Sequence, residues 1–255
     1  MTPTAELYKE NCFVIGYDEE YIKDAFGQEP VMHENKELME YLAAHIGSKE
    51  PSEKGFALDE PYATLYFTLS WLRKVREETD PVSQNPHWEI SCDPVFHMEP
   101  GPPMIQVQMA AYQPVTEWLE ELGARHVDLP LLYIYSREQE EEAKEDFFNH
   151  IGLENSNPIL EQWNTLSAEE KALACYLQHH TDNHYRQSLC GAIMLLKGRI
   201  SDAQFAQICC AASSISPHLG DVSEEMFKQI FRHFTDKAKE VQTVFKMLAC
   251  DTVEK

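Results

Sequence analysis

Basic side chains are scarce in this chain of 255 residues. Lysine and arginine together number 21, against 43 aspartate and glutamate residues, so the formal charge is −22 at pH 7. Nucleic acids and anionic membranes are disfavoured as partners because this charge repels their phosphates. A basic protein partner is permitted, and an acidic surface that only keeps the protein soluble is an equally good interpretation. The charge is uneven, with a net −19 over residues 1–152 and a net −3 over residues 153–255.

Long apolar runs, a secretory signal and paired cysteines are also lacking. A helix that spans a bilayer needs about 18 or more apolar residues in succession, and no such run occurs. The N-terminus shows no apolar segment typical of a signal peptide. The seven cysteines are odd in number and form no CxxC pair. We therefore expect reduced thiols and a cytoplasmic protein.

Short catalytic signatures are absent as well. The sequence contains no glycine-rich dinucleotide fingerprint, no phosphate-binding loop, no HExxH or GxSxG motif and no kinase motif set. These absences remove the common nucleotide-binding and hydrolase classes. They do not exclude an enzyme, so the question stays open and a non-catalytic protein is favoured.

Hydrophobic patterning in the first part of the chain predicts strands together with helices. The apolar run Cys12–Gly16 is typical of a buried strand, and apolar residues alternate with glutamines over residues 104–111, as in a half-buried strand. A further strand is expected over residues 131–135, after a short helix. This order predicts a parallel pair with a right-handed crossover. Residues 1–152 are therefore expected to form a small, mostly parallel sheet covered by helices.

Caps and helix breakers place the helices of this first part. One helix is expected over residues 18–26, and a second begins at Asn35 and ends at Gly47. A longer helix is expected over residues 59–78. The dense prolines of residues 80–103 are expected to exclude helix and to leave a short strand at residues 88–92.

Residues 153–255 show no strand pattern and predict an all-helical domain. The fold class is therefore α+β, with domains 1–152 and 153–255. Ser201 and Gln204 form a capping box, which is typical of a helix N-terminus. Over the last helix, apolar residues recur at steps of four and three, which is a heptad seam. Its aromatic members include Phe227, Phe231, Phe234 and Phe245.

One polar cluster has the spacing of a metal site. His180, Asp182 and His184, here called the histidine cluster, would put two imidazoles at i and i+4 of a helix, about 6 Å apart. The run H-x3-H-x2-Q resembles the last helix of DinB-type four-helix metal proteins. The preceding bundle helices and third histidine of that family are not recognisable, so nothing is transferred from it. Solvated side chains at a helix junction are the favoured alternative.

A second polar set, which includes Asp93 and His97, lies in the proline-rich segment. A rigid loop after a strand is a common place for a site, so acid–base chemistry or metal ligation is one interpretation. His97 would then supply a third ligand to the histidine cluster. A loop held by proline is the favoured interpretation.

Three functional hypotheses follow. The favoured one is a non-catalytic intracellular protein-binding protein, such as an adaptor, an inhibitor, an immunity-type protein or an assembly factor. Its contacts would be the acidic N-terminal surface, including Glu138 and Glu141, and the aromatic seam of the last helix. The alternative is a metal-dependent enzyme that uses the histidine cluster, and no cofactor is predicted otherwise. The third is a homodimer built on the last helix, although the core of the helical domain is favoured for that seam.

Overall fold

The computed structural model describes residues 2–9, 11–17, 19–27, 29–48, 51–52, 55–56, 58–84, 86–91, 93–96, 104–124, 158–179, 187–213 and 223–249. The strands and the elements that alternate with them are β1 (Thr4–Lys9), β2 (Cys12–Tyr17), β3 (Glu20–Tyr21), β4 (Met32–His33), α1 (Lys36–Gly47), β5 (Pro51–Ser52) and β6 (Gly55–Phe56). The helices that follow are α2 (Tyr62–Arg76), α3 (Pro81–Gln84), α4 (Pro86–Ser91), the 3-10 turn η1 (Pro94–Phe96), α5 (Met104–Glu121), α7 (Pro158–Asn164), α8 (Ala168–His179), α9 (Leu189–Leu196), α10 (Asp202–Ser213) and α11 (Glu224–Ala249). The fold class is α+β, as predicted: a small N-terminal sheet with helices, then a region whose described elements are helical.

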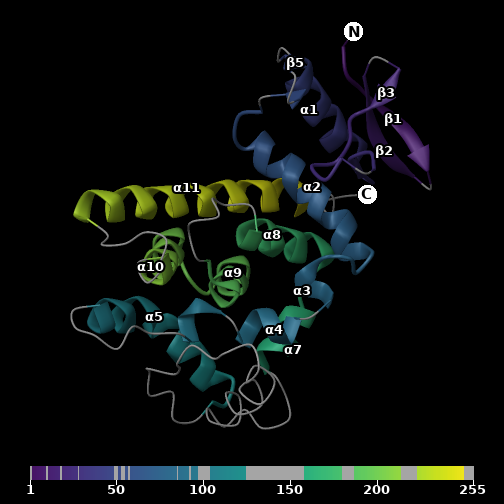
Figure 1. The fold of residues 1–255 in the computed structure, drawn as a ribbon. Coiled ribbons are helices and arrows are strands. Elements are labelled where there is room, and N and C mark those ends of the chain that lie inside the picture. Colours follow the sequence, from purple (N-terminus) through teal and green to yellow (C-terminus); the bar gives the residue numbers. More distant parts are fainter. Residues whose placement is uncertain are drawn as a thin grey trace. The chain divides into compact units, whose positions relative to one another are not determined.

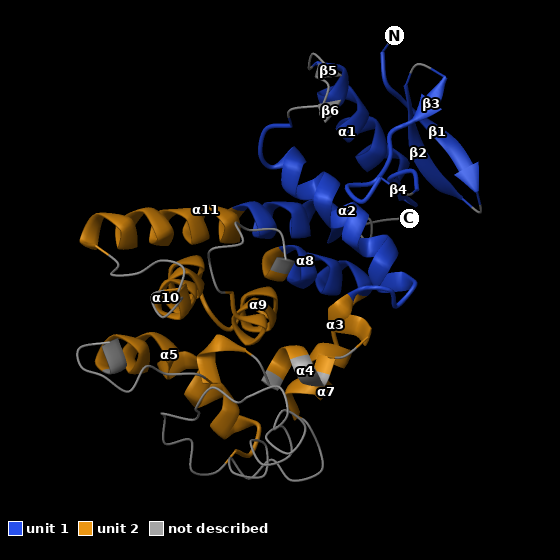
Figure 2. Cartoon of the chain, in the orientation of Figure 1, with its two compact units in different colours: residues 1–80, 168–176, 240–255 blue, residues 81–167, 177–239 orange. Residues whose placement is uncertain are grey.

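Contacts group the chain into two compact units. Unit 1 comprises residues 1–80, 168–176 and 240–255, and unit 2 comprises residues 81–167 and 177–239 (Figure 2). Helices α8 and α11 each contribute residues to both units. This grouping does not test the predicted domains 1–152 and 153–255, so that division stays a prediction.

The sheet of unit 1 is antiparallel, and the prediction of a mostly parallel sheet is wrong. Strand β2 pairs with β1, β3 and β4, each time in the antiparallel sense. Two residues separate β1 from β2, and Asn11 adopts a φ of +70°, so the chain reverses directly. A connection of this length can join only antiparallel neighbours. The predicted parallel pair required a strand over residues 104–111, which instead begins helix α5.

Helix α1 lies against the strands of unit 1 (Figure 1). Its start is as predicted, because the Asn35 side chain accepts a hydrogen bond from the backbone N–H of Leu38 at 2.9 Å. It ends at Gly47. The apolar stripe, which includes Met39, Leu42 and Ile46, is fully buried and forms the core with Val14 and Ile15 of β2.

Two other local predictions are wrong in ways that proline and pairing explain. Residues 18–26 do not form a helix, because Ile22 pairs through its backbone with Ile15 and Val31 at 2.8 and 2.9 Å. The predicted strand at 88–92 falls on helix α4. Helices α3 and α4 each begin at a proline, whose missing N–H the first turn of a helix does not need. The prolines therefore start helices here.

Helix α5 replaces the predicted strand over residues 104–111 and packs against α10 (Figure 1). Its burial is the reverse of the predicted alternation: Gln108 is buried, whereas Val107 and Met109 are exposed. The Gln108 amide donates a hydrogen bond to the carbonyl of Ala211 at 3.4 Å. The expected strand at 131–135 lies outside the described residues.

Helix α11 is the predicted long amphipathic helix. Its buried residues are Ile230, Phe234, Ala238, Val241, Val244 and Leu248. A straight helix drifts relative to a strict seven-residue repeat, so the buried stripe takes in Ile230 and Val244 and leaves Phe231 and Phe245 only half-buried. Within the described part of the chain, no helix is long and apolar enough to cross a membrane.

Candidate functional site

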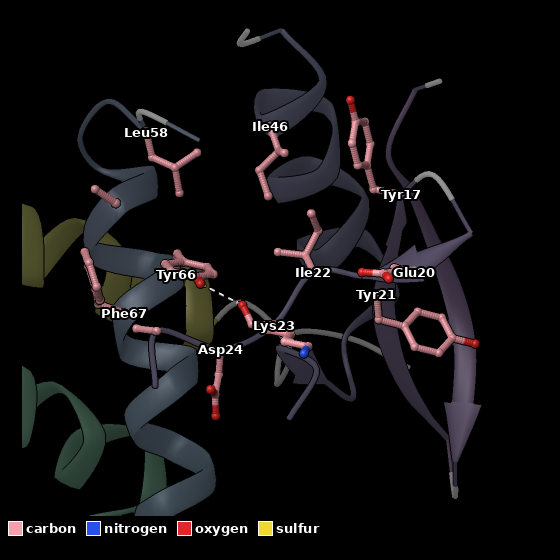
Figure 3. Close-up of a pocket in the computed structure, with 12 residues that line it drawn as sticks. Tyr17, Glu20, Tyr21, Ile22, Lys23, Asp24, Ile46, Leu58, Tyr66 and Phe67 are labelled. Carbon is pink, nitrogen blue, oxygen red and sulfur yellow. Dashed lines mark hydrogen bonds between the residues drawn. The ribbon is translucent and has the colours of Figure 1, made fainter. Parts of the chain in front are cut away.

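A surface pocket of about 540 Å³ opens within unit 1 (Figure 3). Strands β2 and β3 contribute Tyr17 and Glu20 to one side, and helix α2 contributes Tyr66 and Phe67 to the other. Ile46 of α1 lies between them and is fully buried. The pocket therefore combines aromatic, aliphatic and acidic side chains from three parts of the unit.

The segment Ile22–Ala25 forms a rigid edge of this pocket. The Tyr66 hydroxyl donates a hydrogen bond to the carbonyl oxygen of Lys23 at 2.6 Å (Figure 3). Burial, and then the negative charge of Asp24, raise the pKa of Tyr66 to about 12. The hydroxyl therefore keeps its proton and its role as donor throughout the neutral range.

A buried ion pair ties the same segment to helix α2. The Asp24 carboxylate accepts hydrogen bonds from Nε and Nη2 of Arg73 at 3.0 and 2.7 Å, and from the backbone N–H of Phe26 at 3.1 Å. The next residue, Ala25, donates its backbone N–H to Ser70 Oγ at 2.9 Å. Asp24 therefore stabilises the wall of the pocket, since Arg73 already compensates its charge.

A second hollow of about 210 Å³ adjoins the first and shares Tyr17, Glu20 and Tyr21 with it. Its described lining residues include Glu6 and Glu19 as well, and no lysine or arginine. A side chain at Gly16 would bring Cβ within 2.5 Å of a Glu6 carboxylate oxygen, so the glycine makes room for that carboxylate. The two hollows together place apolar and aromatic surface beside exposed carboxylates.

Unit 2 holds a different polar group, the buried carboxylate of Asp93. It accepts hydrogen bonds from the backbone N–H of Val95 at 3.1 Å, the backbone N–H of Cys190 at 2.7 Å and the Ser188 hydroxyl at 3.1 Å. Burial raises the pKa of Asp93 to about 6, although these hydrogen bonds oppose the shift. Ser188 is the N-cap of α9 and accepts the N–H of Gly191 at 2.8 Å. Asp93 thus joins η1 to the start of α9.

The thiols near Asp93 are unsuited to nucleophilic chemistry. Burial raises the pKa of Cys190 and of Cys209 well above the ordinary value. The pKa of Cys210 is raised by burial to about 12. Because only the thiolate attacks, none of the three is a nucleophile near neutral pH.

The structure brings few of the predicted site residues together. His180, Asp182, His184 and His97 lie outside the described residues, as do Glu138 and Glu141. Among the residues that the structure describes, no group of three histidine, cysteine, aspartate or glutamate side chains is placed to hold a metal ion. Metal binding by the histidine cluster therefore stays a prediction.

The four predicted aromatic contacts on α11 are all described. Phe234 is fully buried and packs edge-to-face on Phe205, with ring centroids 6.3 Å apart. Phe227, Phe231 and Phe245 are half-buried. One side of the seam therefore lies in the core. Contact of its half-buried phenylalanines with a partner or a second copy stays a prediction.

The pocket of unit 1 was not foreseen from the sequence. Its residues come from segments far apart along the chain, and each alone is typical of an ordinary strand or helix. A comparison of the chain with protein-family models, curated proteins and solved structures found no match. No relative or structural neighbour therefore assigns a role to these residues.

Proposed function

We propose that this chain is a non-catalytic protein that binds a basic partner protein through the acidic surface of unit 1. The observation that supports this most directly is the smaller hollow, whose described lining includes Glu6, Glu19 and Glu20 and no lysine or arginine. Carboxylates left unpaired at a surface attract positive charge. The net charge of −22 adds a long-range field of the same sign, which speeds encounter with a basic protein.

The arrangement of the described residues supports binding rather than catalysis. Two of the buried carboxylates, Asp24 and Asp93, are taken up by hydrogen bonds within the fold. The buried thiols are held protonated. The smaller hollow of unit 1 places exposed carboxylates beside tyrosine side chains, which is a surface suited to recognising a cation.

The proposal is tested by affinity purification from a lysate of the source cells. The immobilised full chain is washed at about 50 mM and at about 500 mM NaCl, which shortens the screening length severalfold. We expect basic proteins to be retained at low salt and released at high salt. The variant Glu19→Gln/Glu20→Gln should retain severalfold less of the same proteins.

The matched control is Glu120→Gln/Glu225→Gln, which removes the same charge from two exposed carboxylates of unit 2. We expect it to behave like the unmodified chain. Retained proteins that are not basic, or that stay bound at high salt, would contradict the proposal. An equal loss in both double variants would show that net charge acts without any contribution from the surface of unit 1.

A further inference from the structure

We infer that the larger pocket of unit 1 receives an arginine side chain of the partner together with a neighbouring apolar side chain. This inference rests on the proposed function and adds the chemistry of the contact. The two hollows share Tyr17, Glu20 and Tyr21. A single segment of a partner can therefore lie across both, with its charge near the carboxylates and its apolar part in the larger pocket.

The apolar half of the contact follows from the size and lining of the larger pocket. Its volume of about 540 Å³ lies within the range of about 300–1,000 Å³ that is usual for ligand pockets. Ile22, Leu58 and Phe67 each keep part of their surface open to it. Covering this apolar surface favours an occupant with an aliphatic or aromatic side chain.

The preference for a cation follows from the residues on the side of the larger pocket that adjoins the smaller hollow. Figure 3 shows Tyr17 and Glu20 on the strand side of the pocket, across from Tyr66 and Phe67 of α2. Glu20 is exposed and forms no ion pair with any described residue. Asp24 also lines the pocket, but Arg73 already occupies its carboxylate. Glu20 is therefore the acceptor that the pocket offers to an incoming cation.

Arginine fits this surface better than lysine for two physical reasons. Its planar guanidinium can donate two parallel hydrogen bonds to one carboxylate, and Glu20 offers such a carboxylate. It also stacks on aromatic rings, and Tyr17, which pairs with Glu20 across the strands, supplies one on the strand side of the larger pocket. Lys23 also lines the larger pocket, and because its side chain is exposed, water and salt weaken its repulsion of an incoming cation.

The test uses the full chain and two short peptides, acetyl-Gly-Arg-Leu-Gly-amide and its citrulline counterpart. Citrulline keeps the shape of arginine and removes its charge. Titration calorimetry or amide chemical-shift titration measures both affinities. We expect the citrulline peptide to bind about tenfold more weakly, since a hydrogen bond between charged groups contributes at least that factor.

Two variants locate the contact. Glu20→Gln should weaken binding of the arginine peptide about tenfold and leave binding of the citrulline peptide unchanged. This difference is the coupling expected when Glu20 and the peptide guanidinium are in direct contact. Glu29→Gln is the matched control, because Glu29 is an exposed carboxylate of unit 1 outside the pocket. Leu58→Ala should weaken both peptides about threefold, and replacing the peptide leucine by alanine should remove that effect. Melting curves check that each variant is folded.

Three results would overturn the inference. Equal binding of the arginine and citrulline peptides would exclude recognition of a cation. An equal loss in Glu20→Gln and Glu29→Gln would show that the general field binds the peptide, which leaves the proposed function intact. A lysine peptide that binds as tightly as the arginine peptide would refute the assignment to a guanidinium.

Discussion

The buried carboxylate of Asp93 in unit 2 should make the free energy of unfolding depend on pH. Two effects oppose each other there. Burial disfavours the charged form, whereas the hydrogen bonds from Val95, Ser188 and Cys190 favour it. Burial is the larger effect, so the pKa rises from 3.8 to about 6. Were the hydrogen bonds to dominate, the pKa would fall instead, and the two outcomes give stability changes of opposite sign.

The size of the effect follows from the shift. One pKa unit corresponds to about 1.4 kcal/mol, so a shift of about two units is worth about 3 kcal/mol. Because the folded pKa is raised, the protonated carboxyl of Asp93 contributes stability that is fully present below the unfolded pKa. That contribution is lost as the pH rises through about 6.

The assay is urea denaturation of the unmodified chain and of Asp93→Asn between pH 4 and pH 7.5. The contributions of all other titrating groups largely cancel when the free energy of unfolding of the variant is subtracted from that of the unmodified chain. Asparagine leaves one buried N–H without its acceptor, which costs about 1–3 kcal/mol at every pH. The stability of the unmodified chain relative to the variant should therefore fall by about 2.5 kcal/mol between pH 4 and pH 7.5, somewhat less than the full effect because pH 4 lies close to the unfolded pKa of 3.8. A difference that is flat, or that grows with pH, would refute the reasoning.

Four further predictions concern other parts of the chain. Arg73→Gln leaves the buried Asp24 carboxylate without its guanidinium and should cost about 2–4 kcal/mol in urea denaturation, most of which the double variant with Asp24→Asn should recover. Phe234→Ala should cost about 3–5 kcal/mol and Phe231→Ala clearly less, since only Phe234 is fully buried. If the seam holds a homodimer, Phe231→Glu should halve the mass measured by light scattering, and an unchanged mass in a folded variant would remove that hypothesis. If the histidine cluster binds metal, untagged protein should contain stoichiometric Zn²⁺, Mn²⁺ or Ni²⁺ or melt at a higher temperature when one is added.

Features that depend on a few neighbouring residues could be predicted from the sequence. The cap at Asn35 is confirmed. The capping box is confirmed too, since Ser201 donates its backbone N–H to Gln204 Oε1 at 2.9 Å and its hydroxyl accepts the Gln204 N–H at 3.3 Å. The strand β2 and the long helix α11 were also foreseen. In each of these places a local hydrogen bond or a long repeat points to one conformation.

The errors arose where a short pattern fits two conformations. Alternation over residues 104–111 is too brief to separate a strand from about two turns of helix, and packing of α5 against α10 favours the helix. Proline interrupts a helix in most positions but is compatible with the first one, which Pro81 and Pro86 occupy here. The sheet direction was then inferred from the misassigned strand, so one local error changed the predicted topology.

Two groups of described acidic residues differ in their surroundings, and this difference supports the proposals. Asp24 and Asp93 are buried, and arginine or several hydrogen-bond donors compensate each of them, so the fold itself accounts for their presence. Glu6, Glu19 and Glu20 are exposed around the smaller hollow, whose described lining contains no lysine or arginine. Placing like charges together at a surface opposes folding through repulsion. A compensating charge from outside the chain removes that repulsion, so a basic partner at this surface both explains the cluster and gains affinity from it.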